Sequence, residues 1–191
     1  MTPASIQRWN PLAQLFHWLI AALIILQGSL GLWMVSLPKR PGVIPIFSLH
    51  KSIGLTILAL ALLRLCWRLA TRRPPLPVHI AGWQGGTARA THIALYVLLF
   101  ATPLSGWLFD SAASLRPLYW WGLLRMPNLT GGPDAALKSI GLSLHITLFW
   151  TLVAVTVLHV AAALKHHFID RDTVLVGMLP FGRAHSREKP P

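Results

Sequence analysis

Acidic residues and cysteines are scarce in this sequence. Of its 191 residues only 5 are Asp or Glu, against 17 Lys and Arg, and a single residue is cysteine. The lone Cys66 excludes a disulfide framework and a CxxC site, and its apolar neighbours predict a thiol that fills a core. No carboxylate lies at the centre of a long apolar run, which argues against a proton relay, a metal transporter or a simple zinc site.

Charged residues of both signs are few as well. They make up 12% of the chain, whereas about a quarter is usual for a soluble domain, and 54% of the residues are hydrophobic. The formal net charge of +12 comes from basic residues that flank apolar runs, which favours contact with lipid headgroups over binding of nucleic acid. The first apolar run is too long for a signal peptide and lacks a cleavage site after it. A single domain is expected at this length.

Four apolar runs are long enough to cross a bilayer, for which a helix needs about 20 residues. We expect spans at about 12–35, 47–69, 90–109 and 139–164. The second run ends in basic side chains that can reach the headgroups. The sequence therefore predicts an all-α membrane protein, a bundle of four transmembrane helices.

The connections between the spans are rich in proline and glycine. Pro103 lies inside the third span and is expected to kink it. The longest loop contains Trp120 and Trp121, which predict an interfacial element at headgroup depth. We expect the four-helix domain to occupy residues 8–180 and the basic tail 181–191 to be disordered.

Four spans place both termini on one side of the membrane. Lys and Arg mark the side that stays in the cytoplasm. Eleven of them fall on the side of the termini and six on the other, so both termini are predicted to be cytoplasmic. The outer group is Lys39, Arg40, Lys51, Arg116, Arg125 and Lys138, and the inner group is Arg8, Arg64, Arg68, Arg72, Arg73, Arg89, Lys165, Arg171, Arg183, Arg187 and Lys189.

Histidines inside the spans are the main candidates for a functional site, because ionisable residues are costly in a membrane. They fall at two depths. His17 and His159 lie about five residues inside the cytoplasmic ends of the first and fourth spans, whereas His50 and His145 lie near the outer ends of the second and fourth. Each depth therefore receives histidines from two different helices.

The two histidines of the fourth span share a face. His145 and His159 are fourteen residues apart, which leaves them about 40° apart around the helix axis and roughly 21 Å apart along it. This arrangement predicts two stacked haems, each between histidines of facing helices. Gly54 and Gly141, one turn from His50 and His145, are expected to leave room for a porphyrin.

Two alternatives remain for these histidines. They could form hydrogen bonds between helices or bind a metal ion, and four histidines at matched depths favour haem over both. His92, near the cytoplasmic end of the third span, could compete as a ligand of the inner haem or form hydrogen bonds to a quinone or a haem propionate. His166 and His167 lie at the membrane exit and are expected to face solvent or headgroups.

The motifs resemble the bacterial cytochrome b561 family, small di-haem four-helix proteins of the inner membrane. The resemblance runs from about residue 8 to 180. It implies His17 and His159 as ligands of the inner haem iron, His50 and His145 as ligands of the outer one, and a third-helix histidine, here His92, that is not usually an axial ligand. The matching segments are QLFHWL at 14–19, LHKSIG at 49–54, THIALYVLLFATPLSG at 91–106, LH at 144–145 and LHVAAALKHHFIDRDTVL at 158–175.

The resemblance also implies the function. Two histidines fill both axial positions of an iron, which suits electron transfer rather than oxygen binding. Some family members oxidise superoxide at the outer face and reduce ubiquinone, and Lys51 and Lys138 are candidates for steering such an anion. The same basic residues could instead bind haem propionates and lipid phosphates. The alternative functions are a cytochrome b membrane subunit between a partner dehydrogenase and the quinone pool and, more remotely, a non-redox binding protein or transporter.

Overall fold

The computed structural model describes residues 8–38, 40–71 and 82–180. Four long helices dominate it, α1 (Pro11–Ser36), α2 (Ile44–Ala70), α3 (Gly82–Ala113) and α4 (Ala135–Phe168). Each is long and apolar enough to cross a membrane, which confirms the all-α class and the four candidate spans. Shorter elements are the 3-10 turn η1 (Pro41–Val43), the hairpin strands β1 (Tyr119–Trp120) and β2 (Leu124–Arg125), and α5 (Val174–Met178).

The helices extend further than the apolar runs. Capping residues determine where a helix begins, and they lie before the first residue of the apolar run. Asn10 accepts a hydrogen bond from the backbone N–H of Leu12 and thereby caps α1, whose first residue is a proline. Asp134 accepts one from the N–H of Leu137 and caps α4. The third helix begins eight residues before the predicted span and continues through Pro103 to Ala113.

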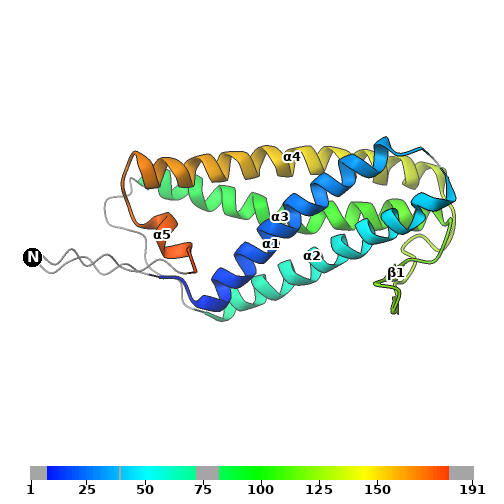
Figure 1. Ribbon diagram of the computed structural model, residues 1–191, viewed down its shortest axis with the longest axis horizontal. Helices are drawn as coiled ribbons and strands as arrows, with labels where there is room; N and C mark the ends of the chain where they lie inside the picture. The colour runs from blue at the N-terminus through cyan, green and yellow to red at the C-terminus, as the bar shows by residue number, and fades with distance from the viewer. Residues whose placement is uncertain (1–7, 39, 72–81, 181–191) are drawn as a thin grey trace, which may run out of the picture.

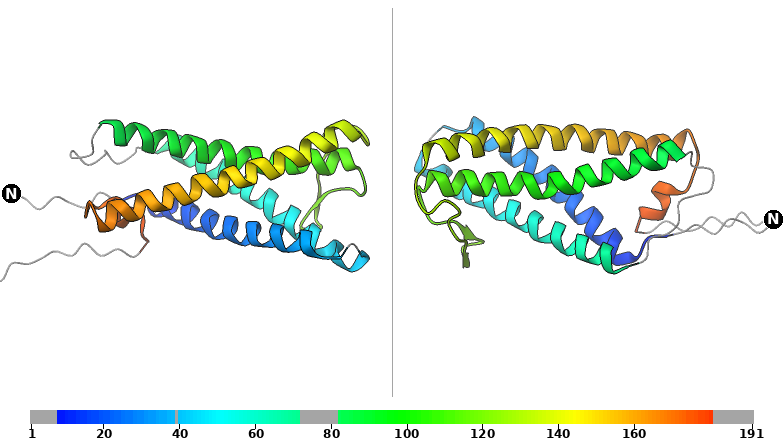
Figure 2. Two further views of the ribbon diagram at one scale, coloured as in Figure 1. Left: turned by 90° about the horizontal axis from the view of Figure 1, so that it is seen from above. Right: turned by 180° about the vertical axis from the view of Figure 1, so that it is seen from behind.

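The bundle has an inner end and an outer end, named for the predicted orientation. The start of α1 and the end of α4 lie at the inner end beside α5, and the β1–β2 hairpin lies at the outer end (Figure 1). Helix α3 runs alongside α4, and α1 alongside α2 (Figure 2). Buried apolar residues join α1, α2 and α3 into one core: Ile20, Leu30, Ile53, Ile57, Ala61 and Leu99.

Helix α4 meets α1 and α2 in a different way. Among the described residues α4 has no extensive backbone packing against either helix, whereas it packs closely on α3. Side chains span the wider interval instead; for example, a Cβ atom at Gly28 of α1 would lie 3.2 Å from the ring of Phe149 of α4. The predicted histidine pairs face each other across this same interval.

The outer loop folds against α2 and α3. Trp121 donates its backbone N–H to Ser52 Oγ at 3.1 Å, and the indoles of Trp120 and Trp121 both donate to Thr56 Oγ1. Because Thr56 lies three turns inside α2, the two tryptophans reach below the end of that helix. Their position fits the interfacial element that the sequence predicts.

One prediction about the interior is wrong. Cys66 is exposed on α2 and does not fill a core. It lies on the outward side of the bundle with Leu63 and Ala70, where apolar side chains would face lipid. The helical period places this thiol on the face of α2 opposite the core residues.

Candidate functional site

Two pairs of histidine rings lie between α4 and its neighbours. At the inner end, the ring centroids of His17 and His159 are 6.3 Å apart, with an angle of 76° between their planes. At the outer end, the centroids of His50 and His145 are 6.1 Å apart at 84°. The rings in each pair are nearly perpendicular, and their centroid separations lie within the range of edge-to-face contacts. The structure thus brings together the same pairs that depth and helical periodicity predict.

These separations fit an iron atom between each pair. A metal–imidazole bond is about 2 Å long and the ring centre lies roughly 1.2 Å behind the nitrogen, so two axial imidazoles have centres about 6.4 Å apart. The distances of 6.3 and 6.1 Å agree with that value to within a few tenths of an ångström. The donor set is also suitable, because two neutral imidazoles are a common axial pair for b-type haem.

His92 does not meet the same test. Its ring centroid lies 5.3 Å from that of His159, about 1 Å too close for an iron between them. His159 therefore has His17 on one side at the ligand spacing and His92 on the other at a contact spacing. This geometry favours a role for His92 beside the inner site rather than as its axial ligand.

The outer pair is held by groups on neighbouring helices. His145 Nδ1 lies 2.9 Å from the backbone oxygen of Thr102 and donates to it, which leaves Nε2 free as a metal ligand. A Cβ atom at Gly106 would come within 3.0 Å of the His145 ring, and one at Gly31 within 3.1 Å of the His50 ring. Both glycines therefore give these rings the space that they occupy.

The glycines that the sequence assigned to the porphyrin have other neighbours. A Cβ atom at Gly141 would lie 2.8 Å from the backbone nitrogen of Phe109, so this glycine allows α3 and α4 to pack closely. A Cβ atom at Gly54 would meet the side chain of Gln27 at 3.3 Å. Sequence spacing along one helix could not identify Gly31 and Gly106, because both act across a helix–helix interface.

The inner pair has arginines beside it. Arg64 Nη1 lies 3.0 Å from His17 Nδ1 and donates to it. The guanidinium carbons of Arg64 and Arg68 lie 5.8 and 5.3 Å from the ring centre of Tyr96. From the sequence we expected these arginines to reach the headgroups. Arg64 instead points into the bundle, where it can bind an anionic group.

A strap of residues 169–179 closes the inner end of α1. Gln14 donates from Nε2 to the carbonyl of Gly177 at 2.9 Å, and the Trp18 indole donates to the carbonyl of Met178 at 2.9 Å. These two residues flank His17 in the sequence. The strap therefore lies under the inner histidine pair.

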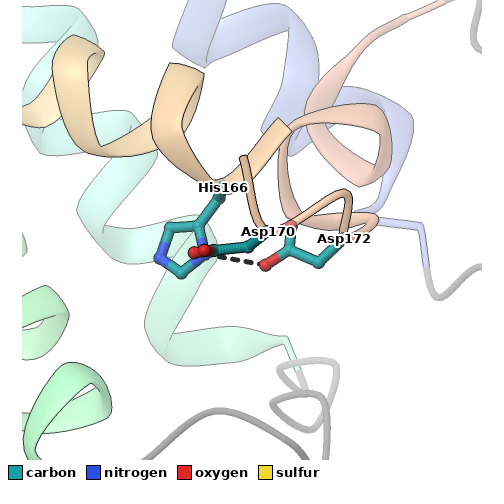
Figure 3. A group of neighbouring side chains, drawn as sticks. All are labelled: His166, Asp170 and Asp172. Atoms are coloured by element: carbon teal, nitrogen blue, oxygen red, sulfur yellow. Dashed lines mark hydrogen bonds and ion pairs between the residues drawn. The ribbon is translucent and has the colours of Figure 1, made fainter. Parts of the chain in front are cut away.

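A polar cluster fixes the turn that leads into this strap. His166 Nδ1 lies 2.7 Å from Asp172 Oδ2 and 3.1 Å from Asp170 Oδ2 (Figure 3). Lys165 forms an ion pair with Asp170 at 2.6 Å. Asp172 also accepts the backbone N–H of Val174 at 3.0 Å. His166 is thus engaged by carboxylates, which corrects the expectation that it faces solvent or headgroups.

The basic residues of the outer end differ in their surroundings. Lys51 forms an ion pair with Asp110 of α3, so its charge is offset. Lys138 is exposed and forms no ion pair within the described part of the chain. Arg40, Arg116 and Arg125 are exposed as well. Of the two lysines that the sequence suggested for steering an anion, Lys138 is the one whose charge is not offset by an ion pair with a described residue.

Comparison with known proteins identifies the relatives of this chain. Residues 8–181 match the profile of the family described as prokaryotic cytochrome b561. The chain is 38% identical over 177 residues to cytochrome b561 homolog 2 of Escherichia coli K12. The alignment covers 91% of this chain and 92% of that protein.

Two further relatives are less similar in sequence to this chain. Cytochrome b561 homolog 1 of Escherichia coli K12 is 29% identical over 69% of this chain and 73% of its own length. A protein of Yersinia pestis named probable superoxide oxidase CybB is 28% identical over 86% of this chain and 91% of its own length.

Proposed function

This chain belongs to the prokaryotic cytochrome b561 family, and we propose that it carries electrons across the membrane through two b-type haems, one at each end of the bundle. The observation that carries the proposal is the ring spacing of 6.3 Å for His17 with His159 and 6.1 Å for His50 with His145. When bound, six-coordinate haems would supply outer-sphere electron transfer. The remaining groups of the site determine how each haem is held.

At the outer end, the imidazoles of His50 and His145 would hold the haem iron. The Nδ1–H bond of His145 to the Thr102 carbonyl fixes both the ring orientation and the tautomer, which keeps Nε2 available. Gly31 and Gly106 leave the two rings free to face each other. These contacts preorganise the outer pair before any cofactor binds.

At the inner end, His17 and His159 would hold the haem iron, and Arg64 contacts Nδ1 of His17. A guanidinium can only donate, so its contact with His17 Nδ1 keeps the ring proton on Nε2, the nitrogen that the iron needs. The Arg64 guanidinium can instead pair with an anionic group such as a propionate. Arg64 and Arg68 are therefore the residues that would hold the inner propionates.

We propose superoxide as the electron donor and ubiquinone as the acceptor. Two superoxide anions would each lose one electron at the outer face and leave as dioxygen, and the two electrons with two protons would reduce one quinone to quinol. The exposed cations of the outer end would attract the anion, and the name of the Yersinia pestis relative supports the assignment. The orientation is the predicted one, with both termini in the cytoplasm and the chain in a bacterial inner membrane.

The test begins with haem content. The purified chain should contain two haems per polypeptide, and alanine at His17, His50, His145 or His159 should remove one haem each. Alanine at His92 is the matched control, because it is also an intramembrane histidine, and it should leave both haems in place. A wild-type protein without haem, or equal losses from all five variants, would contradict the proposed ligand pairs.

Substrates are tested with the loaded protein in nanodiscs. Superoxide generated outside should reduce a ubiquinone analogue with two superoxide anions consumed per quinol. Loss of the reaction in the four ligand variants, but not in the His92→Ala variant, would support the proposed route. A fully loaded protein that reduces quinone only with a co-purified dehydrogenase would instead assign it to the membrane-subunit function.

A further inference from the structure

The two histidines of the outer pair differ at their Nδ1 atoms. His145 Nδ1 has the backbone oxygen of Thr102 at 2.9 Å, whereas His50 Nδ1 is buried and has no hydrogen-bond partner among the described residues. Metal-bound histidines almost always donate this second N–H to an acceptor, which orients the ring and makes it a stronger ligand. The outer site thus has a complete second shell on one side and an incomplete one on the other.

A complementary unpaired atom lies next to His50. Gln27 of α1 donates from Nε2 to the backbone oxygen of His50 at 2.8 Å, and its Oε1 is buried without a partner in the part of the chain that the structure describes. The His50 ring is turned toward the same face of α1, because a Cβ atom at Gly31 would meet Cε1 at 3.1 Å and Nδ1 at 3.6 Å. Gln27 and Gly31 are one turn apart on that face.

Iron binding would make it unfavourable to leave His50 Nδ1 and Gln27 Oε1 unpaired. If Nε2 of His50 holds iron, the ring proton has to lie on Nδ1, and a buried N–H without an acceptor is destabilising. The terminal torsion of a glutamine amide is broad, so the amide can turn as a unit and direct Oε1 toward Nδ1, which lengthens or breaks the Nε2 bond to the helix carbonyl. The acceptor is therefore within reach of the donor that ligation creates.

We propose that Gln27 is the positioning residue of the outer haem, accepting the Nδ1–H of His50 through Oε1. This rests on the proposed bis-histidine site. The bond gives the imidazole more electron density, which stabilises ferric iron and lowers the midpoint potential of that haem. Gln27 would thereby set how readily the outer haem takes an electron from its donor.

The test compares three variants by redox titration of both haems in the full-length protein. Gln27→Met removes the acceptor and should raise the potential of one haem, namely the one that is lost in His50→Ala. Gln27→Glu keeps an acceptor oxygen, so that haem should stay at or below its wild-type potential. Gln14→Met is the matched control, since Gln14 is also a glutamine of α1 that donates from Nε2 to a backbone carbonyl, and it should not move the outer haem.

The outcomes separate this proposal from the haem assignment. If the wild type lacks the outer haem, the proposed function fails before Gln27 is tested. If both haems are present and Gln27→Met leaves the outer potential unchanged, only the role of Gln27 is wrong. If Met and Glu raise it equally, Gln27 serves merely to join α1 to α2 through its amide donor, and the proposal is overturned. Should the Met variant not load haem, a potential above wild type in the Glu variant overturns it as well.

Discussion

At the scale of single residues, the outer site depends on glycines that face imidazole rings from another helix. Gly106 of α3 lies so close to His145 that a Cβ atom would come within 3.0 Å of Cε1 and 3.1 Å of Nδ1. Such contacts are tighter than packed side chains normally allow, so either the ring or α3 has to move. The ring is already fixed by its bond to the Thr102 carbonyl, and a shift would weaken that bond.

We therefore expect Gly106→Ala to impair the outer haem and spare the inner one. Overpacking of this kind costs about 1–3 kcal/mol, enough to lower occupancy or alter the ligand field of the outer iron. Haem content and the electron paramagnetic resonance spectrum measure both effects. Gly86→Ala is the matched control, because Gly86 lies in the same helix and a Cβ atom there would meet nothing within 4 Å. Equal haem spectra for the two variants would contradict the assignment.

At the scale of elements, α3 and α4 form the closest helix pair, and Gly141 explains how. A Cβ atom at this position would lie 2.8 Å from the backbone nitrogen and 2.9 Å from the Cα of Phe109. Backbone atoms cannot rotate away as a side chain can, so a methyl group has to push the helices apart. Small residues at such contacts let membrane helices pack through van der Waals attraction.

Gly141→Ala is accordingly expected to destabilise the bundle by about 1–3 kcal/mol. The thermal unfolding midpoint in detergent, followed by the Soret band and by circular dichroism, measures the loss. Gly132→Ala in the preceding loop is the control, since it has open space for a Cβ atom. An unchanged midpoint for Gly141→Ala would show that α3 and α4 can separate without penalty.

The strap that contains α5 is a second element whose position depends on one side chain. The Asp172 carboxylate accepts from His166 Nδ1 at 2.7 Å and from the Val174 N–H at 3.0 Å, and its side chain is 1% exposed. Asparagine keeps an oxygen for one of these bonds and loses the charge. Breaking a buried hydrogen bond to a charged group costs roughly 1.5–3 kcal/mol.

Asp172→Asn should therefore loosen the strap under the inner histidine pair. Hydrogen exchange of the amides at residues 174–179 measures the loosening, and we expect faster exchange there with little change in the four long helices. Asp134→Asn is the control, because the Asp134 carboxylate also accepts a backbone N–H near the start of a helix but at the outer end. Slow exchange in the strap of Asp172→Asn would mean that the bonds of Gln14 and Trp18 suffice to hold it.

At the scale of the whole molecule, the sequence predicted the spans and the histidine pairs because both follow from local periodicity. Apolar length gives the number of helices, and the 3.6-residue period gives the depth and face of each histidine. The partners of each ring depend on how helices lie side by side, which no single segment encodes. Gln27, Gly31 and Gly106 were missed for that reason, and Gly141 was assigned to the porphyrin instead of the α3–α4 contact. The fold-back of α5 was missed because a helix of five residues forms only through tertiary contacts.

The outer end also carries an electrostatic property that belongs to the molecule as a whole. Lys138 is exposed and forms no ion pair with a described residue, whereas Lys51 forms an ion pair with Asp110. Steering of a small anion depends on the net field near the site, and its effect on the rate falls as salt screens the field. Removing one unpaired charge should therefore slow the encounter with superoxide, and removing a neutral pair should not.

We expect Lys138→Gln to lower the rate of superoxide-driven quinone reduction by roughly two- to fivefold at low ionic strength, and the difference should vanish at high salt. The double variant Lys51→Gln with Asp110→Asn removes the ion pair without changing the net charge, so its rate should stay near that of the wild type. Stopped-flow measurements over a range of salt concentrations give both rates. A rate that is insensitive to salt, or a larger loss in the double variant than in Lys138→Gln, would assign the outer cations to lipid or propionate binding instead.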